Sequence, residues 1–207
     1  MLLIALIWGG YDVYARWQER RLVRRAASAF DQGDFRTASL AARTALNLKA
    51  NSVGASRIMA QIGERTGDRG ALDWRRKIIQ LQPQSVEDIL EWARSAVFFG
   101  DLTMAERALA EVPEASRQTA GYHAVSALVA QGRHQEARAE TEWGEAIRLA
   151  PAEKAYQLQF GISQLRSPNP ERHAAGEKAL QNLREDPRYR IAATRALITE
   201  EIGRAHV

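Results

Sequence analysis

The chain has 207 residues, 45% of them hydrophobic, and it contains no cysteine. This length allows one or two globular domains or one short repeat array, and the hydrophobic content is sufficient for a buried core. The absence of cysteine excludes disulfide bonds, zinc fingers and thiol catalysis. The net charge of +4 comes largely from Arg16, Arg20, Arg21, Arg24 and Arg25. These arginines directly follow an apolar run. A basic segment in this position is better explained by contact with lipid head groups than by contact with nucleic acid.

The first segment, residues 1–17, is largely apolar and carries Trp8, Tyr11, Tyr14 and Trp17. A bilayer span needs about 20 apolar residues, and aromatic rings collect at the membrane interface. The run is shorter, and it lacks the basic start and the cleavage site of a signal peptide. We therefore predict part of a transmembrane helix and a single-pass location in the bacterial inner membrane, with the side of the remaining chain left open. The alternative is an apolar first helix that caps the array.

Four turns recur along the chain, at Gly33-Asp34, Gly67-Asp68, Gly100-Asp101 and Gly132-Arg133. The glycine positions 33, 67, 100 and 132 differ by 34, 33 and 32 residues. Each glycine is expected to end a helix in the left-handed backbone conformation. A small residue follows early in the next helix and lets the two helices approach closely; these residues are Ala38, Ala71, Ala105 and Ala137. A period of this length is typical of helix-turn-helix repeats.

Apolar residues at three- and four-residue spacing predict the helices between these turns. In chain order the helices lie from Leu22 to the Gly33 turn, over 35–48, from Ser52 through the Gly67 turn to Pro83, from Ser85 to the Gly100 turn, over 102–112, from Arg117 through the Gly132 turn to Pro151, and over 155–165, 171–184 and 188–200. Ser85 and Asp88 are spaced as a helix-capping pair. No alternating strand pattern occurs, so we predict an all-α protein.

The pattern resembles the tetratricopeptide repeat, a 34-residue helix-turn-helix unit. The matching residues are Gly33-Asp34-Phe35 with Ala38, Ala45 and Leu46; Gly67-Asp68 with Ala71 and Leu81-Gln82-Pro83; Gly100-Asp101-Leu102 with Ala105; and Gly132 with Ala137 and Leu149-Ala150-Pro151. Residues 18–151 would form about four repeats, and residues 152–201 degenerate C-terminal helices. Ala50 departs from the family, since a proline is expected there. The resemblance implies a right-handed α-solenoid whose stacked hairpins share one core.

The resemblance also implies a peptide-binding groove, because the first helix of each repeat lines the concave face of such a solenoid. Carried over repeat by repeat, the groove residues are Arg57, Gln61, Arg65, Arg94, Phe98, Tyr122 and Ser126. The three arginines would suit an acidic peptide or a free carboxylate, which a guanidinium binds through two hydrogen bonds. The simpler interpretation, which we favour at this point, is a solvated helix surface carrying charge pairs.

The predicted function is therefore a membrane-anchored scaffold that mediates protein–protein interaction. The alternative is the repeat region of a larger enzyme, such as a transferase, or of an envelope assembly or secretion component, with the active domain outside this chain. The expected partner is a protein or peptide, together with the membrane; neither nucleic acid nor a small-molecule substrate is expected.

No catalytic, cofactor-binding or metal site is predicted, and the protein is not expected to be an enzyme. His123, His134, His173 and His206 have no second ligand at metal-binding spacing. No glycine-rich phosphate loop follows a strand, and no serine stands in a nucleophile elbow. The tryptophans Trp74, Trp92 and Trp143 fall on apolar stripes and are expected in the core.

Residues 202–207 do not continue the helical pattern and resemble a translated sequencing adapter, so we predict that they are not native. Together with the short apolar run at residue 1, this ending predicts a piece of a longer protein.

Overall fold

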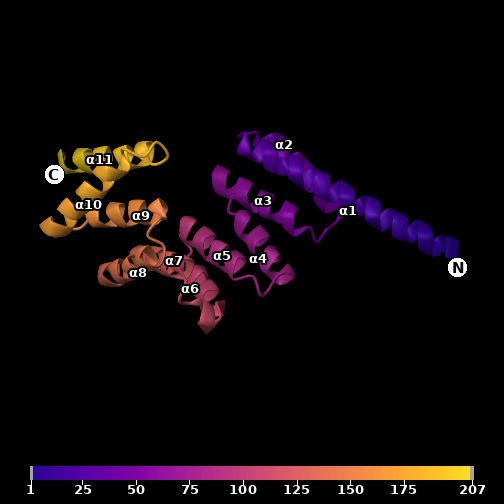
Figure 1. Ribbon diagram of the computed structural model, residues 1–207, viewed down its shortest axis with the longest axis horizontal. Helices are drawn as coiled ribbons and strands as arrows, with labels where there is room; N and C mark the ends of the chain where they lie inside the picture. The colour runs from indigo at the N-terminus through magenta and orange to yellow at the C-terminus, as the bar shows by residue number, and fades with distance from the viewer. Residues whose placement is uncertain (1, 206–207) are drawn as a thin grey trace. The chain divides into compact units, whose positions relative to one another are not determined.

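The computed structural model describes the backbone of residues 2–205 and the side chains of residues 14–202. All regular structure in this part of the chain is helical (Figure 1), which confirms the predicted all-α class. The chain divides into two compact units, Met1–Glu111 and Val112–Val207, which we describe in turn.

The first unit consists of three helix pairs. They are α1 (Leu2–Asp31) with α2 (Phe35–Leu48), α3 (Val53–Thr66) with α4 (Ala71–Leu81), and α5 (Val86–Phe98) with α6 (Leu102–Glu111). Each pair contacts the next, α2 packing on α3 and α4 on α5. The three hairpins therefore form one stack, in the order that Figure 1 shows.

The Gly-Asp dipeptides at these turns have two separate roles. Gly33, Gly67 and Gly100 have φ angles of 77°, 74° and 77°, the left-handed region that glycine enters without strain. The aspartate that follows caps the next helix: Asp34 accepts a hydrogen bond from the backbone N–H of Thr37 at 3.0 Å, and the aspartate after Gly100 caps α6 in the same way. The role of the glycines confirms the prediction, whereas the capping by aspartate was not predicted.

The core of the first three helices is rich in alanine. Its buried side chains are Ala26, Ala29, Ala38, Ala41, Ala42, Ala45, Ala55, Ile58, Met59 and Ile62. Small side chains let the helix backbones approach closely, and the close packing that results removes apolar surface from water. Trp74 packs against this cluster, while Trp92 of α5 and Trp143 of α8 are buried, as predicted.

The second unit contains α7 (Ala120–Gly132) paired with α8 (Glu136–Leu149), α9 (Lys154–Leu165) paired with α10 (Pro170–Leu183), and α11 (Arg190–Ala205). A short 3-10 helix, η1 (Glu114–Ser116), precedes α7. A leucine cluster joins the last three helices; its buried members are Leu158, Leu165, Leu180, Leu183 and Ala193. The predicted helices over 155–165, 171–184 and 188–200 are thus present with small shifts of their ends.

The fourth turn differs from the predicted one by two residues. His134 has a positive φ of 58°, whereas Gly132 is the last residue of α7. Ala139 therefore takes the buried small-residue position of α8, and the predicted Ala137 is exposed. The left-handed positions are 33, 67, 100 and 134, with spacings of 34, 33 and 34 residues. The prediction failed because it admitted only glycine at a position that histidine can also occupy.

The predicted transmembrane segment over residues 1–17 is wrong, and so is the single-pass location in the bacterial inner membrane that was inferred from it. Within the described part of the chain, no helix combines the length and the apolar character that a bilayer crossing needs. The physical reason is visible in the sequence, since Asp12 and Arg16 follow an apolar run of only ten residues. Helix α1 continues without a break across the predicted boundary at residue 17.

The predicted end of the helical pattern at residue 202 also needs correction, because α11 continues through Ala205. His206 and Val207 lie outside the described residues. The non-native origin of residues 202–207 stays a prediction, as do the boundaries at 18–151 and 152–201.

Candidate functional site

Four of the predicted groove residues lie exposed on the first unit. Gln61 and Arg65 are four residues apart on α3, and Arg94 and Phe98 are four apart on α5, so each pair occupies one face of its helix. Phe98 is 63% exposed. Its ring packs edge-on against Phe99, with 4.9 Å between the ring centroids.

Arg57, a fifth predicted groove residue, joins α3 to α5. Its Nε donates to Oδ1 of Asp88 at 3.0 Å and its Nη2 to Oδ2 at 2.8 Å, while Nη2 also donates to Gln82. Burial acts to raise the pKa of Asp88, but the hydrogen bonds of Arg57 and Ser85 outweigh it and leave the pKa below its ordinary value. Because Asp88 already occupies the guanidinium, Arg57 holds two helices together instead of offering an open anion site.

A second ion-pair network joins α3, α4 and α5 and was not predicted. Arg75 of α4 donates from Nε and Nη2 to the two carboxylate oxygens of Glu64, at 2.8 and 3.0 Å. Its Nη2 also lies 3.4 Å from Glu91 Oε2, and Ser95 donates to Glu64. Arg94 donates from Nη1 to Glu91 Oε1 at 2.6 Å, so this groove residue stands at the edge of the network.

One signal of this network was available in the sequence. Arg75 lies between the buried Ala71 and Ile78 on the apolar face of α4. A buried charge is costly unless a partner of opposite charge is present, so an arginine at this position requires carboxylates on the neighbouring helices.

Tyr122 and Ser126, the last two predicted groove residues, lie on α7 in the second unit. Ser126 is 2% exposed, so its hydroxyl is inside the unit. Tyr122 is half-buried beside His123, whose Nδ1 lies 2.7 Å from Glu142 Oε2. The structure thus brings Gln61, Arg65, Arg94 and Phe98 onto the surface of one unit, and the full seven-residue groove stays a prediction.

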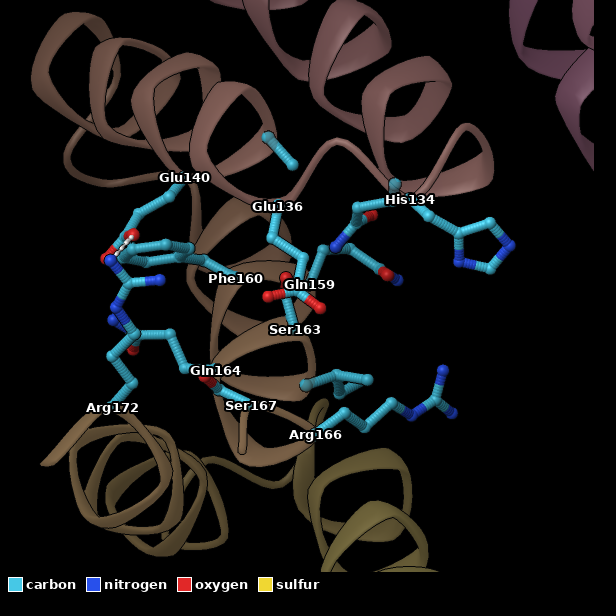
Figure 2. Close-up of a pocket in the computed structure, with 13 residues that line it drawn as sticks. His134, Glu136, Glu140, Gln159, Phe160, Ser163, Gln164, Arg166, Ser167 and Arg172 are labelled. Carbon is cyan, nitrogen blue, oxygen red and sulfur yellow. Dashed lines mark ion pairs between the residues drawn. The ribbon is translucent and has the colours of Figure 1, made fainter. Parts of the chain in front are cut away.

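The second unit contains a cavity of about 360 Å³ between α8, α9 and α10 (Figure 2). Helix α8 contributes Glu136 and Glu140, and α9 contributes Gln159, Phe160 and Ser163. Glu140 is paired with Nη2 of Arg172, at the start of α10, across a distance of 3.1 Å. None of these residues was predicted as part of a site, because the cavity depends on how three helices pack.

No group of three or more histidine, aspartate or glutamate side chains able to hold a metal ion occurs among the described residues. The described residues thus offer two candidate sites. One is the exposed surface of α3 and α5 in the first unit, and the other is the cavity in the second unit.

No protein-family model and no curated protein matches this chain. Several solved structures resemble it. A thermophilic TPR protein of Thermus thermophilus, TTC0263, matches with a TM-score of 0.71 and 18% identity over 87% of this chain and 99% of that one. MamA of Desulfovibrio magneticus RS-1, from residue 41 to its end, matches with a TM-score of 0.62 and 16% identity over 83% of this chain and 96% of that one.

PilF of Pseudomonas aeruginosa has a TM-score of 0.66 and 12% identity, with 91% of each chain covered. At these identities the likeness concerns the fold. Together with the helix pairs and the left-handed turns, it confirms the resemblance drawn from the sequence: the chain has the fold of the tetratricopeptide-repeat proteins.

Proposed function

We propose that the protein is a scaffold that binds a segment of another protein along the exposed surface of α3 and α5. The observation that carries this proposal is the exposed Phe98, which shares a helix face with Arg94, while Arg65 is exposed on α3, the helix that Arg57 and Glu64 link to α5. Aromatic and arginine side chains supply much of the binding energy at protein interfaces.

The two helices are held side by side, which supports the proposal. Arg57 of α3 is bound to Asp88 of α5, and Glu64 of α3 accepts a hydrogen bond from Ser95 of α5. A surface fixed in this way loses little conformational entropy when a partner binds, so more of the interaction energy appears as affinity.

The charges of this surface indicate the chemistry of the partner. Arg65 is exposed and makes no ion pair among the described residues, whereas Arg94 already forms an ion pair with Glu91. A partner segment with an acidic residue for Arg65 and an apolar side chain for Phe98 would complement both features.

Selection from a random peptide library displayed on phage tests this function. We expect the selected peptides to be enriched in aspartate or glutamate next to a large apolar residue. Their affinity, measured by fluorescence anisotropy, should fall about tenfold or more in the variant Arg65→Ala/Arg94→Ala/Phe98→Ala.

A matched control removes the same kinds of exposed side chain from the second helices of the pairs, as Leu40→Ala/Arg43→Ala/Arg76→Ala. The control should bind the peptides as the unmodified protein does. Equal losses in the two variants, or full binding by the first, would refute the proposal.

A further inference from the structure

The cavity of the second unit contains a carboxylate without a partner. Glu136, in the first turn of α8, makes no ion pair among the described residues, although Glu140 one turn later is paired with Arg172. Figure 2 shows the Glu136 side chain directed toward Gln159 and Ser163, while the Arg166 side chain and the His134 ring extend away from it. Arg166 and Arg172 also line the cavity, but Arg172 is paired with Glu140 and Arg166 extends away, so the charged group nearest Gln159 and Ser163 is the Glu136 carboxylate.

The two uncharged polar side chains that Glu136 faces, Gln159 and Ser163, can each accept a hydrogen bond as well as donate one. Gln159 and Ser163 are four residues apart on one face of α9, and among the described residues neither side chain has a hydrogen-bond partner. Phe160 lines the same cavity and offers an aromatic ring. A carboxylate, an amide oxygen, a hydroxyl and an aromatic face together suit a cation that carries several N–H donors.

We propose that this cavity binds a guanidinium or primary ammonium group on an aliphatic stem, with Glu136 as its counter-ion. The amide of Gln159 and the hydroxyl of Ser163 would accept the remaining N–H donors, and the stem would pack on Phe160. The volume of about 360 Å³ is within the range of small-ligand sites. The shared chemistry is found both in a basic side chain of a partner peptide and in a free molecule such as arginine.

This site is independent of the proposed function of the first unit. It belongs to other helices, and it selects a positive charge, whereas the surface of α3 and α5 selects a negative one. Variants at Arg65, Arg94 and Phe98 should therefore leave it unchanged, and failure of one proposal does not entail failure of the other.

The test is a calorimetric titration of the full chain with three probes: acetyl-Gly-Arg-Gly-amide, free arginine and acetyl-Gly-Glu-Gly-amide. We expect the arginine tripeptide to bind saturably and the glutamate tripeptide not to bind. Tighter binding of the tripeptide than of free arginine identifies a peptide side chain as the ligand, and equal binding identifies a small free cation; both results support the cationic site.

The matched variants are Glu136→Gln and Glu185→Gln, since both glutamates are exposed in the second unit and only Glu136 lines the cavity. Glu136→Gln should weaken binding of the arginine tripeptide about fivefold, and Glu185→Gln should leave it unchanged. The proposal is overturned if neither cation binds saturably, if the glutamate tripeptide binds equally well, or if Glu136→Gln binds like the unmodified protein while its melting curve is unchanged.

Discussion

Arg75 donates two hydrogen bonds to Glu64, at 2.8 and 3.0 Å, from a position in α4 that is only 4% exposed. The same position in the other second helices, four residues after the small buried alanine, is filled by Ala42, Leu109 and Trp143. The stack thus contains a guanidinium where the related hairpins contain apolar side chains. The buried guanidinium is tolerated at this position because the carboxylates of α3 and α5 neutralise its charge.

We predict that Glu64→Gln lowers the free energy of unfolding by about 3 kcal/mol, because it leaves a buried guanidinium without its main counter-ion. Urea denaturation followed by circular dichroism measures the effect, and Glu111→Gln, an exposed change, should have almost none. Replacing both partners, as Glu64→Gln/Arg75→Met, should recover part of the loss because no unpaired charge is then buried. A double variant less stable than Glu64→Gln would contradict this account.

The ion pair of Arg57 and Asp88 predicts that the stability of the folded chain falls at acidic pH. The pKa of Asp88 is lowered in the folded chain from its ordinary value of 3.8, because the hydrogen bonds of Arg57 and Ser85 outweigh burial. The unfolded chain therefore takes up this proton first as the pH falls. The stabilisation by Asp88 is complete above about pH 4 and is lost as the pH falls through the folded-state pKa.

Asp88→Asn should accordingly cost about 2 kcal/mol at pH 7, since a neutral amide cannot accept two charge-assisted hydrogen bonds. Between about pH 4 and pH 2 its stability should fall less steeply than that of the unmodified protein. Urea midpoints across this range give the comparison, with the exposed Asp31→Asn as control. Parallel pH profiles for Asp88→Asn and the unmodified protein would show that this carboxylate does not govern the acid response.

Substitutions at two of the left-handed turn positions should change the stability of the fold in opposite directions. Gly67→Ala should lower stability by about 1 kcal/mol, because alanine is strained at a φ of 74°; no atom lies within 4 Å of the added Cβ, so the cost is in the backbone. His134→Gly should raise stability by about 0.5–1 kcal/mol, because it relieves a non-glycine residue at a φ of 58°. Thermal unfolding measures both, and a loss of stability in His134→Gly would indicate that the histidine side chain makes a contribution of its own.

The sequence predicted the helices well because their signals are local. A glycine in a left-handed turn, the aspartate beside it and apolar residues at helical spacing act within a few residues, so Gly33, Gly67 and Gly100 could be identified directly. His134 could not, since histidine at a positive φ is uncommon and the nearby Gly132 matched the pattern better. The membrane prediction failed for a different reason: only ten apolar residues precede Asp12 and Arg16, and no described helix is long and apolar enough to cross a bilayer.

The candidate sites were predictable only in part, because their geometry depends on contacts between helices. The exposure of Arg65, Arg94 and Phe98 followed from the resemblance, which assigns residue positions to helix faces. The engagement of Arg57 by Asp88 and the burial of Ser126 depend on partners distant in the sequence. The cavity beside Glu136 depends on the packing of α8, α9 and α10, for which no motif exists.

The packing of α9 against α10 gives a final prediction, in which the same substitution has opposite signs at two glycines. A Cβ added to Gly176 would lie 2.5 Å from the backbone N of Leu165 and 2.7 Å from the backbone O of Gly161, so the two helices would have to separate. Gly176→Ala should therefore cost about 2–3 kcal/mol. Gly144, within α8, has no atom within 4 Å of an added Cβ. Gly144→Ala should stabilise by about 0.5–1 kcal/mol, because alanine has the higher helix propensity.

Urea midpoints of the two single variants, measured side by side, test whether the two substitutions change stability in opposite directions. Both replace glycine by alanine inside a helix of the second unit, so the difference between them isolates the close approach of α9 and α10 from intrinsic propensity. A stabilising effect at both positions would mean that the backbones of Gly161 and Gly176 are not in close contact in solution. A destabilising effect at Gly176 alone would place this contact among the determinants of the leucine cluster formed by α9, α10 and α11.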